Sequence, residues 1–313
     1  MREELIISGR NNHLIDPHLE IWEWQIPSYL FLGGLVAGLL FFAAIFVINK
    51  KEDEYPTAVK IAPLLTPILL GIGLFFLFLD LKHKLYFWRL YTTIRLESPM
   101  SWGAWVLMAI MPLSVIWSAI HLKELYPKWD WHFKPVKEAI DWLTSKKLWW
   151  AWAMVVLSLI LGIYTGILFS AFNARPLWNT SILGPLFLAS GLSAGAATIV
   201  LLSKHHYERL AMSKIDLLLI AIELFLIIHY LMGLRAGTQV SIEASNLFLG
   251  GEYTALFWIF VVMLGLVIPA GLEIMEIRKM HIPYVIAPIL VLLGSLMLRF
   301  IMAYAGQLSR WLY

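Results

Sequence analysis

Residues 27–48 read PSYLFLGGLVAGLLFFAAIFVI, an unbroken apolar stretch without a charged side chain. A helix that crosses the hydrocarbon core of a bilayer needs about 20 mostly apolar residues, and this stretch has that length. Its apolar residues are continuous rather than alternating, which excludes a strand of a membrane β-barrel. It is longer than the apolar core of a cleavable signal peptide, and residues 1–26 before it are polar and aromatic. We therefore expect a membrane-spanning helix here.

Seven further stretches of the same character predict an all-α membrane protein with eight transmembrane helices. The predicted spans are 27–48, 61–79, 102–122, 149–171, 182–202, 215–234, 254–274 and 283–304.

The composition supports this class of protein. The chain has 313 residues, of which 60% are apolar and 14% charged, and its mean hydropathy is +0.75. Soluble proteins carry about 25% charged residues, so the composition excludes a soluble enzyme, a disordered protein and a nucleic-acid-binding protein. The chain has no cysteine, which excludes disulfides, thiolate nucleophiles and cysteine-ligated iron–sulfur clusters within it.

The spans are expected to form two four-helix bundles related by a parallel repeat. Residues 33–38 read GGLVAG and residues 190–195 read SGLSAG, and four spans separate the two stretches. The alternative is that both are unrelated small-residue packing faces. The predicted units are an N-terminal segment at 1–26, a first bundle at 27–148 and 149–181 with a Lys-rich inner loop at 123–148, a second bundle at 182–304, and a tail at 305–313.

The distribution of Lys and Arg predicts the orientation. Fourteen of these residues flank the spans on one side and nine on the other. Because Lys and Arg are enriched in cytoplasmic loops, both termini are expected on the outer (periplasmic) side of a bacterial or archaeal cytoplasmic (inner) membrane.

Polar side chains inside spans gather at the outer level of the membrane. Ionisable groups there are costly and usually functional, although snorkelling or interfacial anchoring is the alternative for each. We select Asp80, Tyr164 and His229 as candidate catalytic residues. The candidate ligand-binding residues at the same level are Gln25, Tyr29, His83 and Arg299.

A second polar pattern lies along the sixth span. Asp216, Glu223 and Tyr230 are seven residues apart and therefore share one helix face. The stripe is either a proton path or a packing face on which a protonated Glu223 forms hydrogen bonds between helices. Glu273, at the inner end of the seventh span, is expected to be interfacial.

The histidines argue against haem. Of the nine in the chain, only His229 lies well inside a span, and His121 lies at the opposite membrane level. Haem held by two histidines needs both at one depth on facing helices, so we expect neither haem nor a metal site in this chain.

Several motifs resemble the NrfD/PsrC family, the quinone-reactive membrane subunits of bacterial respiratory oxidoreductases. They begin with the residues before and within the first span and continue through the fourth span. The motifs are WEWQIPSYLFLGGLVAG at 22–38, LDL at 79–81, FWR at 87–89, SPMSWGAW at 98–105, YTG at 164–166 and ARPLWN at 174–179.

The resemblance implies a membrane anchor that binds menaquinone or ubiquinone. The partners it implies are a ferredoxin-like iron–sulfur subunit and a molybdopterin catalytic subunit, in a complex that reduces polysulfide, sulfur, thiosulfate or tetrathionate. It also implies that Tyr164 holds the quinone head. The sequence departs from the family at the start of the first span, where Ile26 and Tyr29 replace an Asn and a His.

Two functions follow from these observations. The first is quinone oxidoreduction as one subunit of a larger complex, with or without proton translocation. The alternative is a secondary transporter with a midplane site at Glu223, since a parallel repeat with a charged midplane residue suits a transporter. A neighbouring gene rich in CxxCxxCxxxCP motifs would favour the first.

Overall fold

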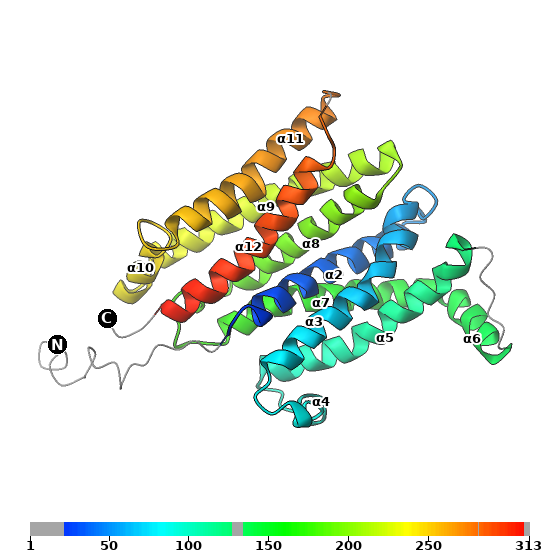
Figure 1. Ribbon diagram of the computed structural model, residues 1–313, viewed down its shortest axis with the longest axis horizontal. Coiled ribbons are helices and arrows are strands. Elements are labelled where there is room, and N and C mark those ends of the chain that lie inside the picture. The colour runs from blue at the N-terminus through cyan, green and yellow to red at the C-terminus, as the bar shows by residue number, and fades with distance from the viewer. Residues whose placement is uncertain (1–21, 127–133, 281, 310–313) are drawn as a thin grey trace, which may run out of the picture.

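The computed structural model describes residues 22–126, 134–280 and 282–309, and within those ranges it contains helices and no strand. Eight helical segments are long and apolar enough to cross a membrane (Figure 1). Each coincides with one of the predicted spans, so the predicted fold class is confirmed. Both ends of the described sequence lie at the same end of the molecule, which we call the near side; the opposite end is the far side.

The first four spans contain two irregular helices. They are α2 (Gln25–Ile48), the composite η1 (Thr57–Ile61), η2 (Ala62–Leu65) and α3 (Thr66–Asp80), then α5 (Pro99–Leu125) and α7 (Lys147–Ser170). The second span starts as a π-helix and passes through a 3₁₀ turn at Pro63 before Pro67 opens α3. Proline removes a helical hydrogen bond, which explains the change of helix type at these positions. Pro112 lies inside α5.

The last four spans follow the same alternation of direction. They are α8 (Leu183–Leu202), α9 (His206–Arg235), the composite η4 (Leu256–Val267) and α11 (Ile268–Ile277), and α12 (Ile286–Leu308). Short helices occupy the connections: η3 (Lys84–Tyr86), α4 (Arg89–Thr92), α6 (Lys134–Ser145) and α10 (Gln239–Asn246). Helix α6 lies in the predicted Lys-rich loop, and residues 127–133 of that loop lie outside the described residues.

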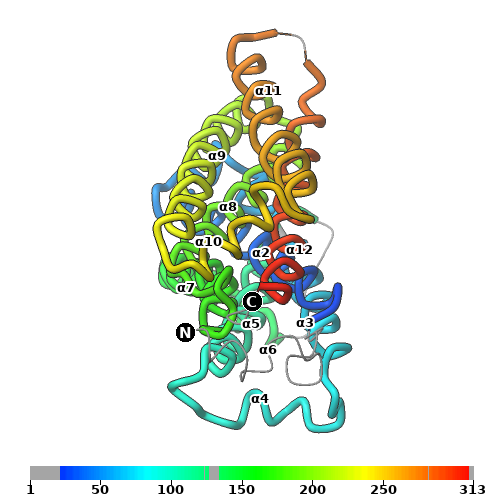
Figure 2. The backbone as a smooth tube through the Cα atoms, turned by 90° about the vertical axis from the view of Figure 1, so that its left-hand side faces the viewer, coloured from blue at the N-terminus to red at the C-terminus, as the bar shows by residue number. Residues whose placement is uncertain are grey.

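The helix contacts group the spans four and four. Helix α2 packs on α3, α7, α8 and α12, and α8 packs on α2, α7, α9 and α12, so these two helices form the centre of the molecule. Figure 2 shows α9 and α11 on one side of this centre and α3 and α5 on the other. A relation between the two groups by a parallel repeat stays a prediction.

The two similar glycine stretches pack against each other where α2 meets α8. A Cβ atom on Gly38 would lie 2.4 Å from the carbonyl oxygen of Gly191, and one on Gly191 would lie 2.7 Å from that of Gly34. Glycine at these positions therefore allows backbone contact between the helices, as small residues do in other membrane helix pairs.

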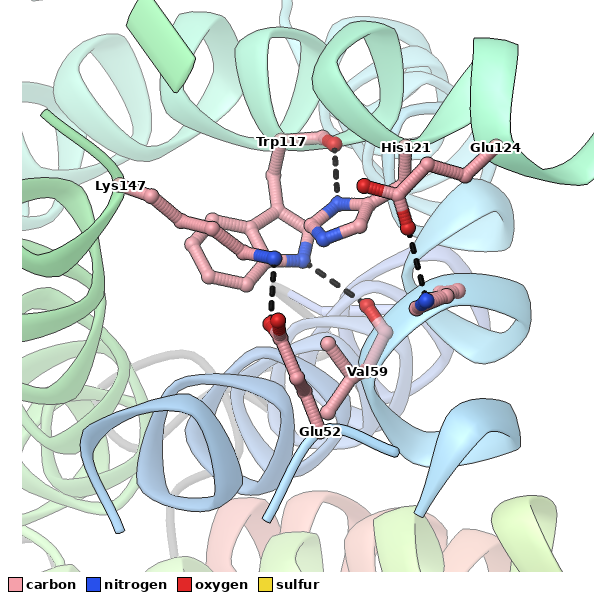
Figure 3. Close-up of polar contacts among 7 residues, drawn as sticks. Glu52, Val59, Trp117, His121, Glu124 and Lys147 are labelled. Atoms are coloured by element: carbon pink, nitrogen blue, oxygen red, sulfur yellow. Dashed lines mark hydrogen bonds and ion pairs between the residues drawn. The ribbon is translucent and has the colours of Figure 1, made fainter. Parts of the chain in front are cut away.

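A network of ion pairs joins the elements at the far side of the first group (Figure 3). Lys60 pairs with Glu124 at 2.7 Å, and Lys147 pairs with Glu52 at 2.5 Å. Beside these pairs the indole Nε1 of Trp117 donates to the Val59 carbonyl at 3.0 Å, which ties α5 to the π-helix η1. The network fixes the irregular start of the second span against α5 and α7.

At the near side the first described residues are held by the end of α12. The backbone N–H of Trp22 donates to Gln307 Oε1 at 2.8 Å, and Gln307 Nε2 donates to the Trp22 carbonyl at 2.9 Å. The indole of Trp22 packs against Phe169 and Trp178, with ring centroids 5.4 and 5.3 Å away. These contacts position Trp22 over the near-side end of the first four helices.

Candidate functional site

An enclosed cavity of ≈70 Å³ lies near the near side, between α2, α3, α5, α7 and the segment that contains α4. Its polar side chains come from four of these elements: Tyr29, Asp80, Tyr91 and Tyr164. The rest of its wall is apolar and consists of Trp22, Ile26, Leu77, Leu81, Leu90, Met100, Ala104, Leu107 and Leu168. Three phenolic hydroxyls and one carboxyl group therefore surround a space whose remaining wall excludes water.

The hydroxyl of Tyr29 is the most telling atom of this cavity. It is buried, and within the described part of the protein it has no hydrogen-bond partner. Tyr164, from the facing helix α7, is also buried and is its electrostatic neighbour. A buried hydroxyl without a partner costs about 1–3 kcal/mol, so the site suits a ligand that supplies an acceptor.

Gly103 makes room for the Tyr164 ring. A Cβ atom on Gly103 would lie 1.9 Å from Cζ of Tyr164 and 2.1 Å from its hydroxyl oxygen. The ring therefore crosses α5 at a place where only glycine fits, and it reaches the cavity by this route.

Asp80 and Tyr91 close the cavity on the side of the α4 segment. Asp80 is the last residue of α3 and is half-buried, with Glu23 as its charged neighbour. Burial raises the pKa of the Tyr91 hydroxyl, which therefore remains a hydrogen-bond donor at neutral pH. The carboxyl group of Asp80 can exchange protons, which the three hydroxyls do only at high pH.

Three larger hollows share walls with the cavity. An apolar groove of ≈320 Å³ on the lipid-facing side of α3 shares Leu77, Leu81, Leu90 and Tyr91. A hollow of ≈460 Å³ in the 81–101 segment shares Leu81, Leu90 and Met100, and its wall also includes Lys82, His83, Arg89 and Arg95. A groove of ≈440 Å³ between α5 and α7 shares Tyr164.

The structure brings together only part of the predicted near-side set. Tyr29, Asp80 and Tyr164 line one cavity, and His83 lines the neighbouring hollow. Gln25 is half-buried at the start of α2, and its amide nitrogen is 3.4 Å from Glu23.

His229 does not face this cavity. It lies on α9 in the other group of helices, its side chain is exposed, and its ring stacks on Phe225 with centroids 4.0 Å apart. The sequence gives the depth of His229 but not the direction of its side chain.

Arg299 belongs to the second polar set and not to the cavity. Its guanidinium is fully buried and donates to Ser190 Oγ at 2.6 Å, to Ser295 Oγ at 2.7 Å and to the Phe187 carbonyl at 3.1 Å. Glu223 is its electrostatic partner. The expectation that Arg299 joins the cavity residues is corrected by these contacts, because α12 turns this side chain toward α8.

The stripe on α9 faces the protein interior, as its spacing predicts. Glu223 is 2% exposed, and its carboxyl group contacts Ser190. Asp216 Oδ1 accepts from Ser193 Oγ at 2.5 Å, and the Tyr230 hydroxyl donates to the Leu177 carbonyl at 2.8 Å. Each member thus has a partner on a neighbouring element.

Sequence reasoning missed several residues of these two sets. The expectation that Glu273 is interfacial is wrong: it is 1% exposed and contacts Asp216. Short hydroxyl side chains carry little signal in a single sequence, and the fit of a glycine to a ring on another helix carries none. The other missed residues are Tyr91, Gly103, Ser190, Ser193 and Ser295.

Comparison with known proteins agrees with the arrangement of spans and motifs. The model of the family described as "Polysulphide reductase, NrfD" matches residues 12–309. The chain belongs to the NrfD family. It is 33% identical to Protein NrfD of Escherichia coli K12 over 92% of its own length and 96% of that protein. It is 32% identical to the C subunit of polysulfide reductase from Wolinella succinogenes, over 92% and 94%.

As a member of the NrfD family it is an integral membrane protein, and it is similar to these relatives along nearly their whole length. The matched region contains all eight spans and both polar sets. Among the described residues of this NrfD-family protein, no group of three or more His, Asp or Glu side chains could hold a metal ion.

Proposed function

We propose that this protein is the quinone-reactive membrane subunit of a respiratory oxidoreductase in a bacterial or archaeal inner membrane. It would exchange electrons between menaquinone or ubiquinone and an iron–sulfur partner subunit. The relatives include a subunit of polysulfide reductase, so we propose sulfur-compound reduction (polysulfide, sulfur, thiosulfate or tetrathionate) as the role of the complex.

The observation that carries this proposal is the cavity between Tyr29, Asp80, Tyr91 and Tyr164. A quinone offers two carbonyl acceptors and supplies two-electron, two-proton redox chemistry. The orphaned Tyr29 hydroxyl and the neighbouring Tyr164 hydroxyl suit one carbonyl. Asp80 is the wall group that can hold and release a proton, which is the role of a general acid–base in such a site.

The lipid-facing groove beside α3 suits an isoprenoid tail. Its wall is entirely apolar or aromatic, and it shares four residues with the cavity. The groove between α5 and α7 shares one residue and contains Glu97. We therefore place the tail along α3.

The segment from Lys82 to Glu97 suits the iron–sulfur subunit. Its side chains are mostly exposed, and cations outnumber anions in it. The guanidinium of Arg89 lies over the rings of Tyr86 and Trp88, 4.8 and 5.7 Å from their centroids. This cationic and aromatic surface adjoins the cavity, so an acidic partner docked here would bring its redox centre close to the quinone. A molybdopterin subunit would bind to that partner.

The stripe on α9 supports proton translocation coupled to quinone turnover. Asp216, Glu223 and Tyr230 contact Ser193, Ser190 and the Leu177 carbonyl in turn, from the far side to the near side. The alternative of a transporter with a site at Glu223 has less support, because Ser190 and Arg299 enclose that carboxyl group and the cavities described above all line the first four spans.

The experiment is quinol turnover by the purified complex, with Tyr164→Phe as the test variant and Tyr126→Phe, exposed on the far side, as its control. Losing one donor in a dry site costs about 1–3 kcal/mol, or roughly five- to a hundredfold in rate. Extraction of the complex should yield bound quinone. A complex without quinone, with equal turnover in both variants, would refute the proposal.

A further inference from the structure

Two buried acids meet on neighbouring helices toward the far side of the membrane. Asp216 on α9 is 0% exposed, and Glu273 on α11 is 1% exposed. Their carboxyl groups are in hydrogen-bonding contact, and α11 packs along α9 at this level. Burial of two acids against each other needs an explanation, because carboxylates are almost never fully buried without a partner.

One oxygen of each acid has no other donor. Asp216 Oδ2 and Glu273 Oε2 are both buried and unpaired within the described part of the protein. Two ionised carboxylates in contact would repel strongly away from water, so both cannot be charged. A single proton between them satisfies both oxygens at once.

The contacts of Asp216 indicate which acid holds the proton. Its Oδ1 accepts from Ser193 Oγ at 2.5 Å, the short distance typical of a hydroxyl that donates to an ionised carboxylate. Asp216 is then the charged member, and Glu273 is the protonated donor.

We propose that Asp216 and Glu273 form a one-proton carboxyl pair that loads protons from the far side onto the polar path toward Glu223. The pair carries a net charge of −1 with one proton and is neutral with two. A proton that arrives from water neutralises Asp216, and a proton that leaves toward Glu223 restores the charge. The same number of protons enters and leaves.

Charged groups connect the pair to the far-side surface. Glu276 lies one turn from Glu273 on α11, is half-buried, and contacts Ser213 of α9. Arg209 and His206, also on α9, are its charged neighbours. Apart from Glu223, these are the charged groups that face the pair from α9 and α11, and α8 contributes the hydroxyl of Ser193.

Hydroxyl groups connect the pair to the middle of the membrane. Asp216 and Glu223 are two turns apart on α9, or about 10 Å, too far for direct transfer. Ser193 and Ser190 lie three apart on α8 and face the same side of that helix. Ser193 contacts Asp216, and Ser190 contacts Glu223, so the hydroxyls divide this distance.

The first test is infrared spectroscopy of the complex in liposomes, following the carbonyl stretch of protonated carboxylic acids and its shift in D₂O. Glu273→Gln keeps a donor to Asp216 but removes the proton that can dissociate. We expect one band to disappear in this variant and to remain in the exposed control Glu243→Gln and in Glu223→Gln. An unchanged band in Glu273→Gln would overturn the pair.

The second test is function, and this part rests on the proposed function. Quinol turnover and membrane potential are measured together in proteoliposomes. We expect Glu273→Gln to slow coupled turnover on the order of a hundredfold, the factor typical of a lost proton-transfer group, with unchanged KM for quinol. Glu273→Asp should recover part of the rate.

The two tests separate the possible failures. A normal rate and normal coupling in Glu273→Gln would overturn the proton path even if the infrared band disappears. A wild-type complex without quinol turnover would refute the proposed function, and the infrared result would still decide whether the pair exists.

Discussion

Gly38 and Gly195 are in backbone contact across the centre of the protein: a Cβ atom on Gly195 would lie 2.7 Å from the Cα of Gly38. This crossing joins the first helix of one group of four to the first helix of the other. Glycine is required on both sides, since any side chain would separate α2 from α8. The central crossing also fixes Ser190, one residue before Gly191 on α8, against Arg299.

We expect Gly38→Ala to destabilise the protein, because its added methyl group would lie 2.4 Å from the Gly191 carbonyl oxygen. Overpacking of this kind typically costs about 1–3 kcal/mol. The control is Gly71→Ala on α3, where no heavy atom lies within 4 Å. The measurement is thermal unfolding in detergent, and equal melting temperatures would show that the crossing is not tightly packed in solution.

Gly103→Ala should impair quinone turnover by moving Tyr164. The methyl group would occupy the position of the tyrosine Cζ, so the ring must leave the cavity. We expect a loss similar to that of Tyr164→Phe, with the complex assembled. In the double variant the two losses should not add, since both act through one hydroxyl. Additive losses would place the effect of Gly103 elsewhere.

Asp80→Asn should abolish quinone turnover. The substitution keeps the size and hydrogen bonding of the side chain but removes the carboxyl group that exchanges protons, a loss of about 10²-fold or more. His83→Gln, in the neighbouring hollow, should have a smaller effect because His83 does not line the cavity. Quinol oxidation assays on both complexes compare them, and the reverse order would move the proton-exchanging group to His83.

Filling the groove beside α3 should weaken quinone binding. We expect Leu74→Trp to raise the KM for a long-tailed quinol severalfold and to leave a tail-less analogue unaffected, because only the tail occupies this groove. Ile160→Trp places the same bulk in the groove between α5 and α7 and serves as the comparison. A larger effect of Ile160→Trp would assign the tail to that groove.

Arg299→Gln should lower stability far more than the same change at the surface. The buried guanidinium donates to Ser190, Ser295 and the Phe187 carbonyl, and hydrogen bonds to a charged group contribute about 1.5–3 kcal/mol each. Arg235, which is exposed and donates to Asn246 Oδ1 at 3.2 Å, provides the matched variant Arg235→Gln. Similar melting temperatures for the two would mean that the buried network contributes little.

The sequence by itself determined the eight spans. Each is a continuous apolar stretch, and the length a bilayer requires is a local property that needs no knowledge of packing. The seven-residue spacing of Asp216, Glu223 and Tyr230 also predicted a shared face, because helical periodicity is local. The motifs around Trp22, Asp80 and Tyr164 pointed to the family that the comparison then showed.

Only the tertiary structure decided which polar groups meet. Position along a span gives the depth of a side chain in the membrane, but its direction around the helix axis depends on how the helices pack. Tyr29, Asp80 and Tyr164 share both depth and direction, whereas His229 shares only the depth and faces outward. Packing likewise turns Arg299 toward Ser190 and brings Glu273 against Asp216, because α12 and α11 present these side chains to α8 and α9.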